Sequence, residues 1–365
     1  MRGEAEGNEI PDTLATCFSS DLVYKHTLTP ERPMTRAPRP DFLVIGAPKA
    51  GTTALHAALA QHPDVFVSDP KEPKYWLCDG APPPAWCGPG DKHSQQEWIW
   101  RADDYFPLFA PAGEDQVRGE STPFYLWSRG AHRRIAEDLP DVRLVAVVRD
   151  PIDRAHSNWM HLWSDGLEPE SDFVTAFDRE AERVRAGWAP FWRYRELGRY
   201  GEQLQHLHRY VDPARILVVR YRDLVDEPGA TVDRVSRFLG IREGLVDSIP
   251  RDNSRSFVPP GWRPRLFGPV VRGGARLGQF VAPEVWRRLH PLSINLLSDG
   301  RDAARPRLDA TSRQRLVDTY ADDIGLLSEL TGQDFEDWLS PESRGSYAER
   351  SATVTRLVPG VSARM

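Results

Sequence analysis

Lysine is nearly absent from this sequence of 365 residues, which has five lysines among its 47 basic side chains. Arginine has evidently replaced lysine wherever either residue would serve, so the surviving lysines mark sites that require a compact ammonium rather than a planar guanidinium. Three of the five lie in two short motifs, Pro48-Lys49 and Pro70-Lys71-Glu72-Pro73-Lys74. These two motifs are therefore the first candidates for functional sites.

Cysteine is also scarce, since the chain holds only Cys17, Cys78 and Cys87. Three cysteines are too few, and odd in number, for a disulfide framework. Cys78 and Cys87 flank a loop rich in proline and glycine, so pairing or a metal site with a distant ligand stays open. Free thiols are favoured, because no cysteine spacing is typical of zinc.

Long apolar runs and an excess of basic charge are absent as well. The run 144–148 is too short to span a membrane, and the first residues lack the basic-then-apolar order of a signal peptide. We therefore expect a cytoplasmic protein without a membrane span. The net charge of −6 does not favour nucleic acid as a partner, so an anionic ligand must be held by local clusters.

Apolar runs at 42–45, 142–148 and 216–219 alternate with segments of helical periodicity. This alternation predicts an α/β fold: a P-loop-like parallel sheet flanked by helices, in a single domain. We expect a flexible arm at 1–39, the domain at 40–340 and a tail at 341–365. The expected helices are 54–60, 131–139, 152–163, 171–186, 198–211, 229–239 and 311–330, with loops and short helices over 250–308.

The loop 46–53, Gly46-Ala47-Pro48-Lys49-Ala50-Gly51-Thr52-Thr53, separates the first expected strand from the first expected helix. This order directs backbone N–H groups and the positive end of a helix dipole toward an anion. The loop nearly matches the nucleotide P-loop pattern, but Thr52 stands where that pattern has lysine. Lys49 lies inside the loop instead, so the sequence predicts an anion site of a different kind.

A second candidate anion site follows another apolar run. Arg149 comes directly after 142–148, and Ser157 lies eight residues later on the expected helix 152–163. An arginine fork and a hydroxyl at the carboxyl edge of a parallel sheet suit a phosphate dianion. The Asp-Pro pair after Arg149 is also a common helix start, so Arg149 and Ser157 alone do not indicate a phosphate site. They indicate one because they follow the loop 46–53 in the chain.

Together these motifs resemble those of the sulfotransferases that use 3′-phosphoadenosine 5′-phosphosulfate (PAPS). The resemblance covers about 41–340 and is densest at the loop 46–53 and at 147–157. It extends to 120–125, 197–200, 216–224, 238–240, and the closing helix with Gly332 and Trp338.

The resemblance implies a role for each motif. The 5′-phosphate would be held by Lys49, Ala50, Gly51, Thr52 and Thr53, and the 3′-phosphate by Arg149 and Ser157. Tyr221 would lie beside the adenine. Arg305, together with Arg301 and Arg307, corresponds to a basic loop over the cofactor in some members, and the alternative interpretation of these arginines is solvated surface charge.

The family's cytosolic members carry a catalytic histidine just before the Ser/Thr-Pro-x-Tyr segment, but residues 117–125 contain no histidine here. Glu72 instead resembles the catalytic glutamate of heparan-type and many bacterial carbohydrate sulfotransferases. We therefore predict Glu72 as the general base, with Lys71 beside it drawing charge toward the sulfuryl oxygens. The alternatives are a surface ion pair at Glu72, or His56 or His62 as the base.

The predicted function is transfer of the sulfuryl group from PAPS to a hydroxyl of a small-molecule or carbohydrate-like acceptor, with no metal; natural-product biosynthesis is one setting for such a reaction. A minority of the twelve tryptophans is expected to contact this acceptor. One alternative is a P-loop kinase that phosphorylates a small molecule, which predicts Mg²⁺ dependence and a lysine after Gly51. Another is a nucleotide-binding regulator without turnover. The sequence leaves the acceptor and the oligomeric state open.

Overall fold

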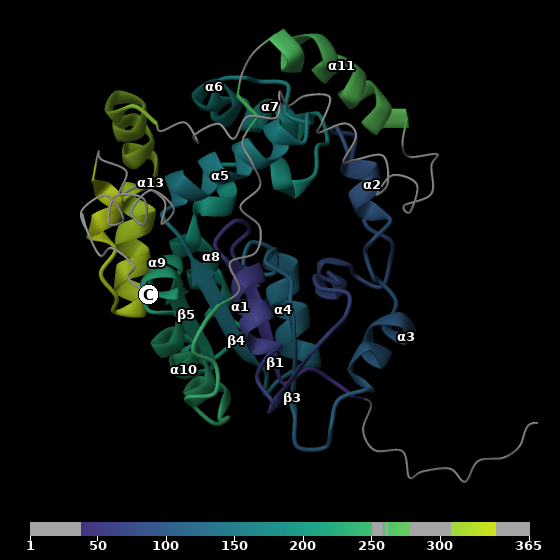
Figure 1. Ribbon diagram of the computed structural model, residues 1–365, viewed down its shortest axis with the longest axis vertical. Coiled ribbons are helices and arrows are strands. Elements are labelled where there is room, and N and C mark those ends of the chain that lie inside the picture. The colour runs from purple at the N-terminus through teal and green to yellow at the C-terminus, as the bar shows by residue number, and fades with distance from the viewer. Residues whose placement is uncertain (1–37, 250–257, 260–261, 278–307, 341–365) are drawn as a thin grey trace, which may run out of the picture. The chain divides into compact units, whose positions relative to one another are not determined.

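The computed structural model describes residues 38–249, 258–259, 262–277 and 308–340. Within these ranges the chain forms a five-stranded sheet in the order β2-β3-β1-β4-β5 (Figure 1). All four strand pairs are parallel. This confirms the predicted α/β fold. The strands are β1 (Phe42–Gly46), β2 (Val65–Val67), β3 (Val117–Ser121), β4 (Arg143–Val148) and β5 (Ile216–Arg220).

Alternate residues of the central strands pack into two separate apolar clusters, because successive side chains point to opposite faces of a sheet. Leu43 and Ile45 of β1 lie in the cluster that contains the buried sides of α4 (Arg129–Asp138), α5 (Pro151–Ser164), α8 (Tyr200–Leu207) and α13 (Ala310–Thr331). Phe42 and Val44 lie in the cluster that contains the buried sides of α1 (Thr52–Leu59), α9 (Tyr221–Asp226) and α10 (Pro228–Leu239). Helices therefore cover both faces, as the unbroken apolar runs of β1 and β4 require.

Most helices lie close to where the periodicity predicts them. These are α1 (Thr52–Leu59), α4 (Arg129–Asp138), α5 (Pro151–Ser164), α8 (Tyr200–Leu207), α10 (Pro228–Leu239) and α13 (Ala310–Thr331). The single helix predicted over 171–186 is two helices, α6 (Phe173–Asp178) and α7 (Glu180–Arg185), which meet at Arg179. Short helices not predicted are α2 (Asp91–Gln95), α3 (Ala102–Tyr105) and α9 (Tyr221–Asp226).

The prediction of only loops and short helices over 250–308 is wrong for one segment. Residues Trp262–Leu277 form α11, a helix of 16 residues that contains Pro269. The proline and the glycines of this segment argued against a long helix in the sequence. Most of 250–308, including Arg301, Arg305 and Arg307, lies outside the described residues, as do 1–37 and the tail 341–365. The predicted domain limits therefore stay predictions.

None of the helices within the described ranges is both long enough and apolar enough to cross a membrane.

Candidate active site

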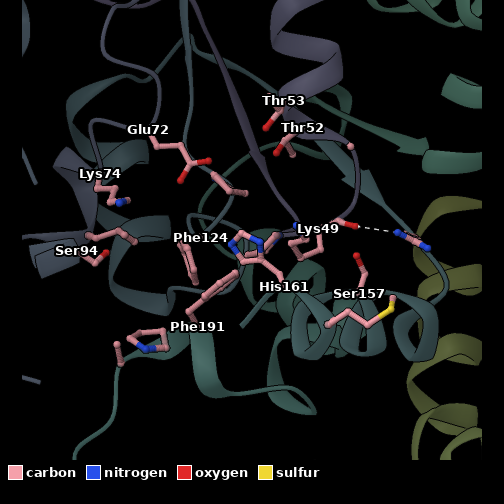
Figure 2. Close-up of a pocket in the computed structure, with 18 of the residues that line it drawn as sticks. Lys49, Thr52, Thr53, Glu72, Lys74, Ser94, Phe124, Ser157, His161 and Phe191 are labelled. Atoms are coloured by element: carbon pink, nitrogen blue, oxygen red, sulfur yellow. Dashed lines mark hydrogen bonds between the residues drawn. The ribbon is translucent and has the colours of Figure 1, made fainter. Parts of the chain in front are cut away.

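The candidate site lies where the strands end. Parallel strands bring their carboxyl ends to one edge of a sheet, and the residues that follow them meet there. The loop 47–51 follows β1, Arg149 follows β4 and Tyr221 follows β5. Glu72 and Phe124 lie in the segments that follow β2 and β3. All five segments line one cavity of about 570 Å³ (Figure 2).

The loop between β1 and α1 is shaped to bind an anion. Gly51 precedes α1 in the left-handed conformation with φ 93°, and no side chain caps the first turn of the helix. The first N–H groups of α1, from Thr52 onward, therefore have no helical partner and lie beside the cavity that Thr52 and Thr53 line. A Cβ atom on Gly51 would lie 2.7 Å from Cδ2 of Tyr221, so only glycine fits.

Two residues of the same loop have different environments. Lys49 has φ 66°, a conformation unusual for a residue with a side chain, and it lines the cavity. Ala50 is fully buried, and its N–H donates to the Ala47 carbonyl over 3.1 Å. The structure thus brings the predicted residues Lys49, Gly51, Thr52 and Thr53 to the cavity, and it places Ala50 in the turn that supports them.

Arg149, Ser157 and Tyr221 line the same cavity as the loop before α1. The Arg149 guanidinium lies 4.7 Å from the centre of the Tyr221 ring, and its Nη1 donates to the Lys49 carbonyl over 3.3 Å. Ser157 lines the same cavity from α5. Arg149 therefore joins the two predicted anion sites directly.

The corner between β4 and α5 is held by Arg313, a residue of α13 that the sequence analysis did not identify. Asp150 caps α5 by accepting the N–H groups of Ile152 and Asp153, at 2.9 and 3.1 Å. Arg313 of α13 pairs with the Asp150 carboxylate and, over 3.2 Å, with the Asp153 carboxylate. The Arg313 side chain is only 1% exposed, so this ion pair is part of the core that fixes Arg149. Nothing near Arg313 in the sequence marks this role.

Glu72 lies in a backbone segment of unusual conformation after β2. Both Glu72 and Lys74 have positive φ, 61° and 66°. The Lys71 ammonium lies 2.5 Å from Oε1 of Glu72. Glu72 and Lys74 line the cavity, and Lys71 is not among the residues that line it. Glu72 therefore does form an ion pair with Lys71, as the alternative interpretation predicted, but its carboxylate also lines the cavity.

Buried polar groups support this segment from beneath. The Lys74 N–H donates to Oγ1 of Thr122 over 3.2 Å, and the Thr122 hydroxyl donates to Oε2 of Glu120 over 2.8 Å. Tyr105 donates to the other Glu120 oxygen over 3.4 Å. Burial, with a smaller contribution from the charge of Glu72, raises the pKa of Glu120 to about 7. A hydrogen-bonded chain thus connects the end of β3 to the Glu72 segment.

The two histidines considered as alternative bases lie in different places. His62 is buried, its Nε2 lies 2.8 Å from the Arg242 carbonyl, and its Nδ1 accepts the Asp64 N–H. It does not line the cavity. His56 lies nearer, with Nδ1 2.9 Å from Oγ of Ser121. Burial and the Lys71 ammonium lower the pKa of His56 to about 4, so it is neutral at pH 7.

Several lining residues were not predicted, and one pattern in the sequence marks some of them. Ser157, Met160, His161 and Ser164 all line the cavity from α5. Their spacing places them on one face of the helix. Once Ser157 is assigned to the cavity, the helical period predicts that the other three residues line it as well. Phe124 and Phe191 had no such signal in the sequence. Of the twelve tryptophans, Trp86 and Trp98 line the cavity, whereas Trp76, Trp159, Trp163 and Trp192 are buried in the core.

The two described cysteines, Cys78 and Cys87, are free thiols. Burial raises the pKa of the Cys78 thiol to about 11. Over the described ranges, no cluster of three or more His, Cys, Asp or Glu side chains is placed to hold a metal ion. The expectation that no metal is needed stays a prediction.

Comparison with known proteins decides the family. The model of the sulfotransferase family matches residues 40–243, which is more than half of the chain. The chain belongs to the sulfotransferase family. The matched region contains the loop 46–53, Glu72, Arg149, Ser157 and Tyr221, and it ends before α11 and α13.

Individual relatives agree with this assignment. Human heparan sulfate glucosamine 3-O-sulfotransferase 6 is 30% identical over 235 residues, which are 63% of this chain and 62% of the relative. Bovine bifunctional heparan sulfate N-deacetylase/N-sulfotransferase 2 is 26% identical over 336 residues, 89% of this chain and 33% of the relative. The chain thus spans less than two thirds of the length of these curated relatives.

Among solved structures, the sulfotransferase from Alicyclobacillus acidocaldarius is similar over 82% of this chain and 98% of its own. The TM-score is 0.62 and the sequence identity 25%.

Proposed function

We propose that this protein transfers a sulfuryl group from PAPS to a hydroxyl group of an acceptor. One observation carries the proposal. A single cavity brings together a lysine-bearing anion loop at a helix N-terminus, an arginine with a serine, and a carboxylate, namely Lys49, Arg149 with Ser157, and Glu72. Membership in the sulfotransferase family supports it.

The residues present fit a nucleotide that carries two phosphate sites. The uncapped N-terminus of α1 offers N–H donors to the 5′-phosphate, next to the Lys49 ammonium. Arg149 and Ser157 offer a guanidinium and a hydroxyl to the 3′-phosphate. The Tyr221 ring, which the Arg149 guanidinium covers, offers an aromatic surface beside them.

PAPS, when bound, supplies an activated sulfuryl group whose transfer leaves adenosine 3′,5′-bisphosphate (PAP). The Lys49 ammonium and the N–H groups of α1 stabilise the negative charge that grows on the 5′-phosphate as the bridging S–O bond breaks. Glu72 accepts the proton of the acceptor hydroxyl. The Lys71 ammonium lies 2.5 Å from the Glu72 carboxylate, at the point where the sulfuryl oxygens would be presented.

The donor is identified by incubating the chain with labelled PAPS or labelled ATP, each with and without EDTA. We expect the chain to consume PAPS with release of PAP, and EDTA to have no effect. Consumption of ATP that EDTA abolishes would support the P-loop kinase instead. Binding of either nucleotide without any turnover, when tested with acceptors of several classes, would indicate a regulator.

A further inference from the structure

The cavity extends beyond the donor site into a region of different chemistry, which we call the acceptor side. Its walls within the described chain include Phe124 after β3, Phe191 beside α5, and Trp86 and Trp98 near α2. Figure 2 shows Phe124 and Phe191 on the side of the cavity away from Ser157. Because the donor residues occupy the other side, the acceptor must approach Glu72 from this side.

Positive charge is sparse on this side. Over the described residues the whole cavity is lined by three lysines and arginines, Lys49, Lys74 and Arg149. Lys49 and Arg149 belong to the proposed donor site, so Lys74 is left for the acceptor. The Lys74 ammonium lies 5.5 Å from the centre of the Trp98 ring, a cation–π geometry, and the residue is only 9% exposed. A polyanion such as a sulfated glycosaminoglycan needs several exposed cations along its path, and the described walls do not provide them.

Aromatic rings, in contrast, surround the path to Glu72. Phe124 and Phe191 meet edge to face with ring centres 6.0 Å apart, and Phe191 meets His161 edge to face at 5.8 Å. Trp86 and Trp98 form a second pair at 5.0 Å. Rings in such arrangements present both edges and faces, which is what another planar ring packs against. Among the polar residues that line the cavity outside the proposed donor site are Ser94, His161 and Ser164, which can orient a hydroxyl-bearing ring by hydrogen bonds.

We infer that the acceptor is an aromatic hydroxyl compound, a phenol or naphthol without a cluster of negative charges. This inference rests on the proposed function and adds the acceptor class to it. The phenolic oxygen forms a new bond to sulfur while the bond between sulfur and the 5′-phosphate oxygen breaks, and that oxygen keeps the electron pair. The phenolic proton passes to the Glu72 carboxylate. The chain thus differs in its acceptor from its relatives named for heparan sulfate.

The test compares three acceptors with the full chain and PAPS: 2-naphthol, its saturated analogue decahydro-2-naphthol, and heparan sulfate. We expect sulfated 2-naphthol by mass spectrometry, a much slower reaction of the saturated alcohol, and little transfer to heparan sulfate. The KM for 2-naphthol should not change between low and high sodium chloride, since no ion pair is involved. Equal use of the saturated alcohol, or preference for heparan sulfate with a KM that rises with salt, would overturn the inference.

Two variants test whether the preference for an aromatic acceptor depends on the residues of the acceptor side. Phe191→Ala should raise the KM for 2-naphthol about tenfold while leaving the KM for PAPS unchanged. Phe238→Ala, another half-buried phenylalanine that lies in the opposite apolar cluster, is the matched control and should change neither. An unchanged KM in Phe191→Ala would overturn the inference.

Calorimetric titration of PAP separates the two proposals. If PAP binds but no naphthol is sulfated, the acceptor inference is wrong and the donor site stands. If PAP does not bind, the proposed function itself fails.

Discussion

Three residues other than glycine have a left-handed backbone within the described chain: Lys49, Glu72 and Lys74. All three line the cavity. Such a conformation costs about 1–3 kcal/mol in a residue with a side chain and persists only where the surroundings enforce it. Their backbone is therefore held so that an ammonium, a carboxylate and a second ammonium face one space.

Lys49→Ala is expected to lower the rate of sulfuryl transfer about a hundredfold or more, the usual effect of removing one charge contact to the transition state. PAPS binding should weaken less than the rate falls, because the N–H groups of α1 still hold the 5′-phosphate. Single-turnover kinetics measure the chemical step, and calorimetry measures the affinity. A single-turnover rate close to that of the parent would exclude Lys49 from the transition state.

Glu72→Gln keeps the size of the side chain but cannot accept a proton, so turnover should fall about 10²–10⁴-fold while PAP binds normally. His56→Asn is the control, because the His56 ring lies 2.9 Å from Ser121 Oγ, near the Glu72 segment, and is the alternative candidate for the base. It should keep most of the activity. If Glu72→Gln is active and His56→Asn is inactive yet folded, as judged by its melting temperature, the base is the histidine.

At the scale of elements, the apolar runs predicted β1, β4 and β5, but β2 and β3 escaped prediction. β2 has only three residues. β3 lies between β2 and β1 yet reads Val-Arg-Gly-Glu-Ser, which has no apolar pattern. Its glycine is needed because a Cβ on Gly119 would lie 2.2 Å from Cζ of Phe42. Its Glu120 is buried under the Glu72 segment, so function and close packing have replaced the usual strand signal.

The support that β3 gives to the Glu72 segment can be tested at Thr122, whose hydroxyl accepts the Lys74 N–H and donates to Glu120. Thr122→Val keeps the shape but removes both hydrogen bonds. We expect a loss of about 1–3 kcal/mol in the free energy of unfolding, since buried polar groups lose their partner. We also expect a lower kcat with unchanged PAP affinity.

Thr122→Ser keeps the hydroxyl and should restore both kcat and stability. If Thr122→Ser is as impaired as Thr122→Val, the methyl group matters and the hydrogen-bonded chain does not. Chemical denaturation and steady-state kinetics on the same preparations distinguish these outcomes.

At the scale of the whole molecule, the site depends on residues far apart in the chain. The parallel sheet predicted from the sequence brings the residues that follow β1 and β4 to one edge, because all parallel strands end at the same edge. The sequence did not predict Arg313, which lies beyond the match to the family model and fixes the corner next to Arg149. Contacts of this kind depend on how α13 packs against α5, which no local pattern encodes.

Because the proposed donor site joins the segments after β1, β4 and β5, its ligand should stabilise the domain as a unit. At a concentration one hundred times its Kd, PAP should add about 2.7 kcal/mol to the free energy of unfolding. AMP at the same concentration should raise the melting temperature less, since it has no 3′-phosphate for Arg149 and Ser157 to bind.

The Arg149→Ala variant should bind PAP more weakly by about 1.5–3 kcal/mol, and the thermal shift that PAP causes should fall close to that of AMP. Differential scanning calorimetry of both proteins with both nucleotides measures this, and equal shifts by PAP and AMP in the parent would remove the 3′-phosphate site from Arg149 and Ser157.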